Sequence, residues 1–324
     1  MIAYTLRGEG GRALLERREA PAPEPGRGQV LVRVRAAGLN RGELLVARGA
    51  KPGAAPKPAG GEAAGEVVAL GEGVVGFASG ARVMGRAGGA FAEYALMDAR
   101  EAIPVPQRLS WEQAAAVPLV FMVVHDMLVE QGRLAAGEWL LVTGVTSGVG
   151  VGALQAGKAL GARVAGTSGS KAKLARLAPL GLDLALETRK GDFRDAVMAA
   201  SDGKGANLIV NTVGGSMFPE CMRTLAFEGR LATVGHLDGV MRSEIDLEAL
   251  HAKRLTLFGV SNRLRSAEQR SATVRGFVAD LLPAIADGRI EPLIDRVFGF
   301  DELAAAKDYM ESDAQVGKIV VRMT

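Results

Sequence analysis

One stretch decides the fold of this chain: Leu140-Leu141-Val142-Thr143-Gly144-Val145-Thr146-Ser147-Gly148-Val149-Gly150. An apolar strand enters a turn of small residues, and a helical pattern leaves it. Glycines let the backbone turn tightly and approach a pyrophosphate, and the start of the helix offers free N–H groups to phosphates. The spacing differs from the usual G-x-G-x-x-G. Small residues recur every third position, at Gly144, Ser147 and Gly150, and Gly148 is an additional glycine between the last two. An ordinary strand-to-helix turn is the alternative, so the surrounding sequence has to decide.

Strands and helices alternate on both sides of this turn. Strands are predicted at 138–143, 163–167, 183–186, 208–211, 230–234 and 255–259, and helices at 149–160 and 171–180. This alternation predicts a parallel sheet with helices on both faces, which supports the nucleotide-binding interpretation of the turn.

The first third of the chain is predicted to be rich in β-strands. Residues 29–37 (QVLVRVRAA) alternate apolar and basic side chains, which is typical of a half-buried strand. Short strands are predicted at 66–70, 82–85 and 91–96, and the Gly/Pro-rich residues 49–61 are predicted to form a loop. Ser110-Trp111-Glu112-Gln113 matches a capping box at a helix start, and Pro118 interrupts that helix before a second helical run to about Gln131.

The last part of the chain is predicted to return to this β-rich region. It contains helical patterns at about 266–287 and 301–312 and a closing strand at 318–323, which cannot complete the parallel sheet alone. We therefore expect a catalytic domain begun by residues 1–118, a nucleotide-binding domain over 119–262, and a return to the catalytic domain over 263–324.

Composition excludes several classes of protein. The chain has 324 residues, 48% of them hydrophobic and 23% charged, which is typical of large buried cores. The most apolar stretch, 114–124, is too short to span a bilayer, and the N-terminus has no signal-peptide pattern, so we expect no membrane segment and a cytoplasmic location. The basic residues are scattered, which gives nucleic-acid binding little support. A single cysteine, Cys221, rules out a disulfide framework and a multi-cysteine metal site.

The second predicted strand of the sheet indicates which nicotinamide cofactor is bound. A site for NAD usually places an acid about 20 residues after the glycine turn, where it holds the ribose 2′-OH. Here 166–173 reads GTSGSKAK, with hydroxyls and two lysines in place of an acid. Lys171 and Lys173 are either a solvated helix start or partners of a 2′-phosphate. Lysines oppose the helix dipole at a helix start, so a bound anion explains them better and favours NADPH.

The ordered motifs of the whole chain resemble those of the zinc-independent quinone oxidoreductases of the medium-chain dehydrogenase/reductase superfamily. The glycine turn occupies the place of the family's A-A-x-G-G-V-G. The other matching segments are 36–40 (AAGLN), 60–68 (GGEAAGEVV), 80–83 (GARV), 89–94 (GAFAEY), 211–215 (NTVGG) and 316–320 (VGKIV).

The resemblance implies an α/β protein in which a GroES-like, β-rich catalytic domain built from both chain ends flanks a Rossmann domain with a doubly wound parallel sheet. It also implies a cofactor in the cleft between them, and a homodimer formed through the last Rossmann strand, about 254–259. Zinc-dependent relatives keep a cysteine where this chain has residues 41–43 and a His-Glu pair where it has Gly61 and Glu62. A lone Glu62 cannot make a catalytic zinc site, so no metal is expected.

Carried over residue by residue, the resemblance places Asn40 near the nicotinamide and the substrate, where its amide can hydrogen-bond a carbonyl oxygen. A turn residue after a strand is the alternative for Asn40. Many relatives have a threonine where this chain has Val123, and a tyrosine near the 2′-phosphate where it has Thr188. The predicted cofactor contacts are Gly144, Ser147, Gly148, Val149, Gly150, Ser168, Lys173, Arg189, Asn211, Gly235, Val260, Asn262 and Lys318.

The predicted reaction is hydride transfer from C4 of NADPH to a quinone or a small α,β-unsaturated carbonyl (an enone). Related enoyl-thioester reductases use a tyrosine in the loop after the Asn40 region, and 48–51 has none. With no strong proton donor in view, substrates whose products take a proton from water are favoured. An enoyl-thioester reductase and a non-catalytic relative that binds NADPH or RNA stay open as alternatives. Segments 41–61, 86–89 and 262–266 are expected to shape the substrate pocket.

Overall fold

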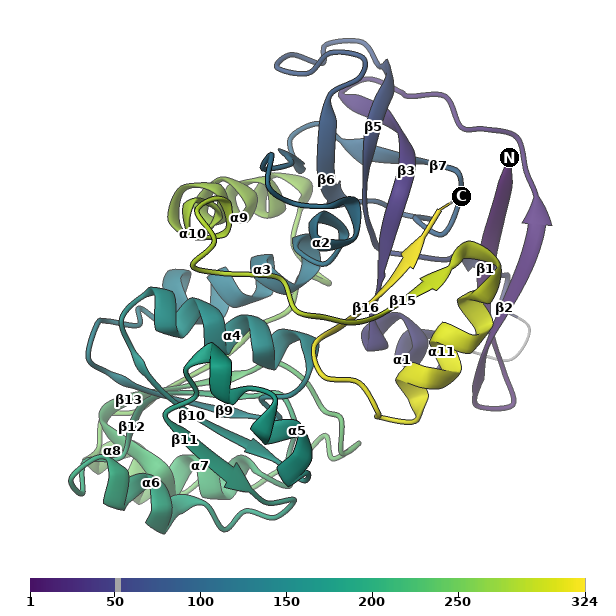
Figure 1. Ribbon diagram of the computed structural model, residues 1–324. Helices are drawn as coiled ribbons and strands as arrows, with labels where there is room; N and C mark the ends of the chain where they lie inside the picture. Colours follow the sequence, from purple (N-terminus) through teal and green to yellow (C-terminus); the bar gives the residue numbers. More distant parts are fainter. Residues whose placement is uncertain (50–53, 324) are drawn as a thin grey trace. The chain divides into compact units, whose positions relative to one another are not determined.

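The computed structural model describes residues 1–49 and 54–323, which form two compact units (Figure 1). The first unit contains residues 1–119 and the described part of 292–324, and the second contains Val120–Glu291. The chain therefore leaves the first unit once and returns to it, as the closing strand predicted. No helix in the described part of the chain is long and apolar enough to cross a membrane.

A six-stranded parallel sheet forms the middle of the second unit. Its strands lie in the order β11-β10-β9-β12-β13-β14, which is the doubly wound order with β9 as the first strand. Helix α4 lies on one side of the sheet, and α6, α7 and α8 lie on the other (Figure 1). The bounds are β9 Trp139–Thr143, α4 Gly148–Ala159, β10 Arg163–Ser168, β11 Leu184–Glu187, α6 Arg194–Ala200, β12 Ala206–Asn211, α7 Phe218–Thr224, β13 Leu225–Thr233, α8 Leu247–Ala252 and β14 Thr256–Gly259.

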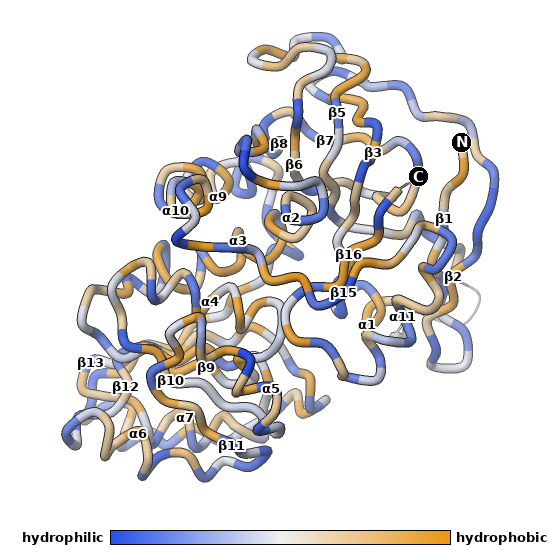
Figure 2. Tube along the Cα trace, in the orientation of Figure 1, coloured by the Kyte–Doolittle hydropathy of each residue, from blue (hydrophilic) through white to orange (hydrophobic). Residues whose placement is uncertain are grey.

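Glycines bring α4 against the central strands. A Cβ at Gly150 would lie 2.5 Å from the Gly144 carbonyl oxygen, and one at Gly157 would lie 2.8 Å from a Leu140 methyl group. A Cβ at Gly166 would meet the Val145 side chain at 2.6 Å. Figure 2 shows apolar colour gathered on the strands beneath the helix, where Leu140, Leu141 and Val142 are fully buried. The small residues of the glycine turn therefore set the distance between strand and helix.

The second unit is longer than the sequence predicted. Helices α9 (Ala267–Asp280) and α10 (Leu282–Ala286) belong to it, so its end lies at Glu291 and not at 262. The reason is packing on α3 (Pro118–His125): Phe277 lies 6.3 Å from the Phe121 ring, and Asp280 lies 2.7 Å from Nε2 of His125. An apolar helix face does not reveal in the sequence which neighbour will cover it.

Two sheets form the first unit. One is three-stranded, with the order β2-β1-β4, and the other is seven-stranded, with the order β15-β16-β3-β5-β6-β8 and β7 paired to β3. The closing strand β16 runs antiparallel to β3, pairing Ile319 with Leu39, which confirms the return of the chain. The bounds are β1 Ile2–Glu9, β2 Arg12–Glu19, β3 Gln29–Leu39, β4 Lys57–Pro58, β5 Glu62–Leu70, β6 Arg82–Arg86, β7 Tyr94–Asp98, β8 Ala102–Pro104, α2 Trp111–Ala115, β15 Ile294–Gly299, α11 Leu303–Glu311 and β16 Lys318–Arg322.

Several local predictions need correction. Residues 41–48, predicted as part of a pocket-shaping loop, form the helix α1 (Arg41–Arg48), and residues 50–53 of the predicted loop lie outside the described residues. Helix α5 (Lys171–Ala175) stops early because Pro179 lacks an N–H and its ring clashes with the carbonyl of Ala175. Strands β1, β2 and β15 were not predicted. The capping box at Ser110 is confirmed, with the hydroxyl accepting from the Gln113 amide.

A substitution at Gly150 tests whether the close packing of α4 on the sheet requires the small residues of the glycine turn. Gly150→Ala is expected to lower stability by about 1–3 kcal/mol, because the new methyl group meets backbone atoms that cannot move aside. Gly42→Ala is the matched control, since its Cβ meets nothing within 4 Å in helix α1 and alanine is the better helix former. Calorimetry should show a lower unfolding temperature for Gly150→Ala alone. Equal unfolding temperatures for the two variants would contradict this account.

Candidate active site

Most of the predicted cofactor contacts gather at one edge of the parallel sheet. All strands of a parallel sheet end on the same side, and ligands of such folds bind at that carboxyl edge. The predicted residues follow the strand order across it, beginning with Ser168 at the end of β10. Beyond it come Gly144 after β9, Asn211 at the end of β12, Gly235 after β13, and Val260 and Asn262 after β14.

The glycine turn exposes the start of α4. Gly144 has a φ of +67°, and a Cβ there would lie 2.7 Å from the Thr212 hydroxyl, so only glycine fits well. The Ser147 hydroxyl caps the helix by accepting from the Gly150 amide at 3.0 Å. The first amides of a helix have no acceptor within it, which leaves those of Gly148 and Val149 available to an anion.

Asn211 is engaged within the turn that follows β12. Its side chain is fully buried, and its Oδ1 accepts from the Thr143 hydroxyl and from the amides of Val213 and Gly214. Its Nδ2 donates to the Gly214 carbonyl at 2.8 Å. The amide therefore holds the turn after β12 in place.

Three of the predicted contacts lie around the end of β10. Ser168 is only 8% exposed, and its hydroxyl lies 3.4 Å from that of Thr146 in the glycine turn. Arg189 folds over Gly169, where a Cβ would collide with the guanidinium Nε. Lys173 is partly exposed on α5, the helix that starts directly after this strand. Together they supply a hydroxyl, a guanidinium and an ammonium group.

An acid that the sequence analysis did not identify also lies here. Glu187 ends β11 and pairs in register with Ser168, and its carboxylate accepts from the Lys171 amide at 3.3 Å. The stretch 166–173 itself has no acid, so this carboxylate comes from the neighbouring strand. Only the parallel register of β10 and β11 could have revealed it.

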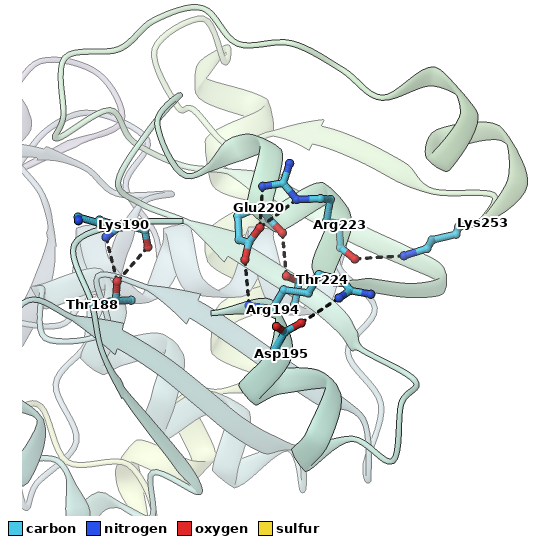
Figure 3. Close-up of polar contacts among 8 residues, drawn as sticks. All are labelled: Thr188, Lys190, Arg194, Asp195, Glu220, Arg223, Thr224 and Lys253. Carbon is cyan, nitrogen blue, oxygen red and sulfur yellow. Dashed lines mark hydrogen bonds and ion pairs between the residues drawn. The ribbon is translucent and has the colours of Figure 1, made fainter. Parts of the chain in front are cut away.

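Thr188, which stands where many relatives have a tyrosine, is held within its own turn. Its hydroxyl accepts from the Lys190 amide at 2.9 Å and lies 2.5 Å from a carboxylate oxygen of Asp192 (Figure 3 shows the contacts of Thr188 with Lys190). Thr188 is thus engaged within the turn, whereas its neighbour Arg189 lies against Gly169, directly after β10.

A surface hollow of about 560 Å³ lies on the second unit, but its charged groups satisfy one another (Figure 3). Glu220 accepts from Arg223 at 2.7 Å, and Arg194 donates to Asp195 at 2.9 Å. Lys253 donates to the backbone carbonyls of residues 223 and 225. Because these pairs are internal and most of the walls come from helices, the hollow is not the candidate site.

The first unit contains a second group of predicted residues. Lys318 is 6% exposed, and its ammonium donates to Oε1 of Glu62 at 2.6 Å, to Oδ1 of Asn40 at 2.8 Å and to the Leu39 carbonyl at 3.1 Å. An ammonium group has three hydrogens to donate, and all three have acceptors. The ammonium group is therefore fully engaged within the first unit, and the predicted cofactor contact of Lys318 stays a prediction.

Three neighbouring strands bring this group together. Asn40 follows β3, Glu62 begins β5 and Lys318 begins β16, and both other strands pair directly with β3. A Cβ at Gly38 would collide with Oε1 of Glu62, so the missing side chain makes room for the carboxylate. Glu62 is fully buried, and its second oxygen accepts from the Leu119 amide at 2.7 Å.

The amide of Asn40 is engaged within the unit. Its Nδ2 donates to Glu62 at 2.9 Å and also lies 3.2 Å from Oε1 of Glu43 and 3.3 Å from the Gly38 carbonyl. Its Oδ1 accepts from Lys318. Two amide hydrogens already have three acceptors, so donation to a substrate carbonyl would have to break one of these bonds.

Glu43, which the sequence analysis did not single out, completes the group. It lies in the first turn of α1, and its Oε2 accepts from the Gly60 amide at 3.1 Å. Burial, and then the negative charge of Glu62, raise its pKa to about 7, although the Asn40 hydrogen bond, Lys318 and the Gly60 amide oppose the rise. Its spacing of three residues from Asn40 at a helix start was the available signal.

Glu43 also fills space at the position where zinc-dependent relatives keep a histidine. A Cβ at Gly61 would lie 3.2 Å from Oε1 of Glu43 and 3.3 Å from a Leu119 methyl group. Within residues 1–49 and 54–323, no three histidine, cysteine or acidic side chains are grouped as metal ligands.

Comparison with known proteins places the chain in a family. The alcohol dehydrogenase GroES-like domain matches residues 26–107, and the zinc-binding dehydrogenase domain matches residues 148–277. An acryloyl-coenzyme A reductase of Metallosphaera sedula is 30% identical over 341 residues, covering 94% of this chain and 96% of that protein. The chain belongs to the quinone oxidoreductase family of the medium-chain dehydrogenase/reductase superfamily. It has the expected GroES-like and Rossmann domains.

Two further similarities show the range of this family. A phenolphthiocerol/phthiocerol polyketide synthase protein of Mycobacterium tuberculosis is 34% identical over 296 residues. That alignment covers 90% of this chain but only 13% of the synthase, so the chain spans about an eighth of that protein's length. The structure of mycobacterial Rv1454c complexed with NADPH has a TM-score of 0.88 and 26% identity, covering 99% of this chain and 100% of that one.

Proposed function

We propose that this chain is an NADPH-dependent reductase that transfers hydride from C4 of the cofactor to a quinone or a small enone without zinc. The observation that supports it most is the carboxyl edge of the parallel sheet, where the glycine turn leaves the amides of Gly148 and Val149 facing a potential pyrophosphate. The similarity to an NADPH complex of Rv1454c supports the same cofactor.

The end of β10 supports NADPH over NADH. Arg189 and Lys173 supply two positive charges beside the Ser168 hydroxyl, which suits a 2′-phosphate. Glu187 lies at the same strand ends, and one of its carboxylate oxygens accepts from the Lys171 amide at 3.3 Å. We propose that the phosphate binds between Arg189, Ser168 and Lys173.

Removing either cation should weaken NADPH more than NADH. Lys173→Ala and Arg189→Ala are each expected to raise the Michaelis constant for NADPH about tenfold, because a charge-assisted hydrogen bond is worth about 1.5–3 kcal/mol. The Michaelis constant for NADH should hardly change, since NADH lacks the phosphate. Lys190→Ala is the matched control on an exposed neighbour. An equal effect on both cofactors would refute this phosphate site.

The residues that stand at the expected ligand positions support a reaction without zinc. Asn40 to Glu43 include no cysteine, and Gly61 supplies no imidazole. The ammonium of Lys318 lies 2.6 Å from Glu62 and neutralises the carboxylate that would remain. We infer that carbonyl polarisation comes from protein hydrogen bonds.

An enoyl-thioester reductase is the second candidate. The full-length similarity to an acryloyl-coenzyme A reductase favours it, as does the similarity to one part of a polyketide synthase. The fold and the cofactor site serve either substrate class equally well. The distinction therefore lies in the electrophile that the purified protein reduces.

A substrate panel tests both candidates. NADPH oxidation should be measured with quinones, small enones, an acryloyl thioester and alcohols, each with and without a metal chelator. We expect turnover with a quinone or a small enone that survives chelation. Turnover with the thioester alone would favour the second candidate, and activity lost on chelation and restored by zinc would refute the zinc-free proposal. Tight NADPH binding without any turnover would favour a non-catalytic relative.

We also propose that the chain forms a homodimer through β14. This strand is at the edge of the six-stranded sheet, and within the described part of the chain its outer side has no partner strand. An unpaired edge is a template for pairing with a second chain.

Sedimentation equilibrium should give twice the chain mass of 33.7 kDa. The amide of Val260 faces β13, where it donates to Thr233, so that of Gly259 faces the open edge. Gly259→Pro should therefore yield monomers, whereas Gly259→Ala should leave the dimer intact. A monomeric wild-type protein would contradict the proposal.

A further inference from the structure

Glu43 differs from the other members of the Asn40 cluster, which we define as Asn40, Glu43, Glu62 and Lys318. Lys318 has an acceptor for each of its hydrogens, and fully buried Glu62 receives Lys318, Asn40 and the Leu119 amide. Glu43 is only partly buried, receives one backbone amide and shares the Asn40 hydrogens with two competing acceptors. Among the contacts of residues 1–49 and 54–323, it is therefore the member of the cluster with hydrogen-bonding capacity left over.

The charges of the cluster favour a proton on Glu43. Glu62 and Lys318 form a close ion pair at 2.6 Å, so a second ionised carboxylate would have no cation of its own among the residues that the structure describes. The charged groups that act on Glu43 are Glu62 from β5 and Lys318 from β16, while Arg41 of its own helix is directed to Asp313 and the Met310 carbonyl. The pKa of about 7 makes the acid form abundant at neutral pH.

We propose that Glu43 is the proton donor of the reaction: its carboxylic acid hydrogen-bonds the substrate oxygen and protonates it as the hydride arrives. This inference rests on the proposed reductase function. It replaces the role that the resemblance gave to the Asn40 amide, whose hydrogens are already engaged. Asn40, Glu62 and Lys318 then act as positioning residues that hold the acid and set its charge environment.

The step balances in atoms and electrons. NADPH gives a hydride, and thus two electrons, to a carbon of the enone or to the quinone, and becomes NADP⁺. The electron pair displaced from the substrate's π system moves to its oxygen, which takes the Glu43 proton to form the enol or the hydroquinone. The Glu43 carboxylate then regains a proton from solvent, so each turnover consumes one NADPH and one solvent proton.

The pH dependence of turnover tests this role. As pH rises through about 7 the acid form of Glu43 is lost, so wild-type kcat should fall about tenfold per pH unit above that point. Glu43→Gln should have a lower kcat that stays level over this range, with an unchanged Michaelis constant for NADPH. Glu43→Asp should restore part of the pH-dependent turnover. Glu24→Gln, at an exposed position, is the matched control and should behave as wild type.

A measurement without turnover reports on the same carboxyl group. Its pKa is raised on folding, so the folded protein binds this proton more tightly than the unfolded chain does, and stability falls as pH rises from about 4.5 to about 7. The unfolding temperature of the wild type should therefore drop by a few degrees relative to Glu43→Gln across this interval. Glu24→Gln should follow the wild type.

The outcomes separate the two proposals. If no quinone or enone is reduced, the proposed function fails, while the stability comparison still reports whether Glu43 holds a proton at neutral pH. If the wild type is active but Glu43→Gln keeps both its kcat and its pH profile, the proton-donor role is refuted and the reductase function stands. If Glu43→Gln does not fold, a wild-type kcat that stays level from pH 6 to pH 9 refutes the role by itself.

Discussion

The ion pair between Lys318 and Glu62 is the interaction on which the first unit depends. Its two ends lie 2.6 Å apart, almost without solvent, on strands that come from opposite ends of the chain. A buried pair of this kind is costly to break, because removal of one partner leaves the other charged and unsolvated. The pair joins the returning strand β16 to β5, and both of its side chains hydrogen-bond Asn40. Its two charges also act on the nearby carboxyl group of Glu43.

In the second unit the corresponding constraint is backbone proximity. Glycines at 144, 150 and 166 allow strand, turn and helix to approach more closely than any side chain would permit. The same close approach leaves the first amides of α4 free for a phosphate. Packing and binding thus rest on the same absent side chains, which explains why the turn is informative both for the fold and for the cofactor.

Each unit carries its own group of polar residues. The second supplies hydrogen-bond donors and cations at the carboxyl edge of its sheet, which suits a dinucleotide. The first supplies a polar cluster in which a single carboxyl group, that of Glu43, retains capacity to donate a proton. In the reaction that we propose, the hydride comes from the cofactor, and the protein contributes orientation and the placement of one proton.

The sequence alone determined the α/β class, the glycine turn and the parallel sheet with helices on both faces, because these depend on local periodicity and small residues. It also predicted the return of the closing strand, since the last segment could not complete the parallel sheet by itself. It also identified Asn40, Ser168, Lys173 and Arg189 through motifs. Only the tertiary structure decided that Lys318 is saturated internally, that Asn211 holds the turn after β12, and that Glu43 and Glu187 join the candidate sites. Those facts depend on the register and neighbours of strands distant in sequence, and hydrogen-bond saturation has no sequence period.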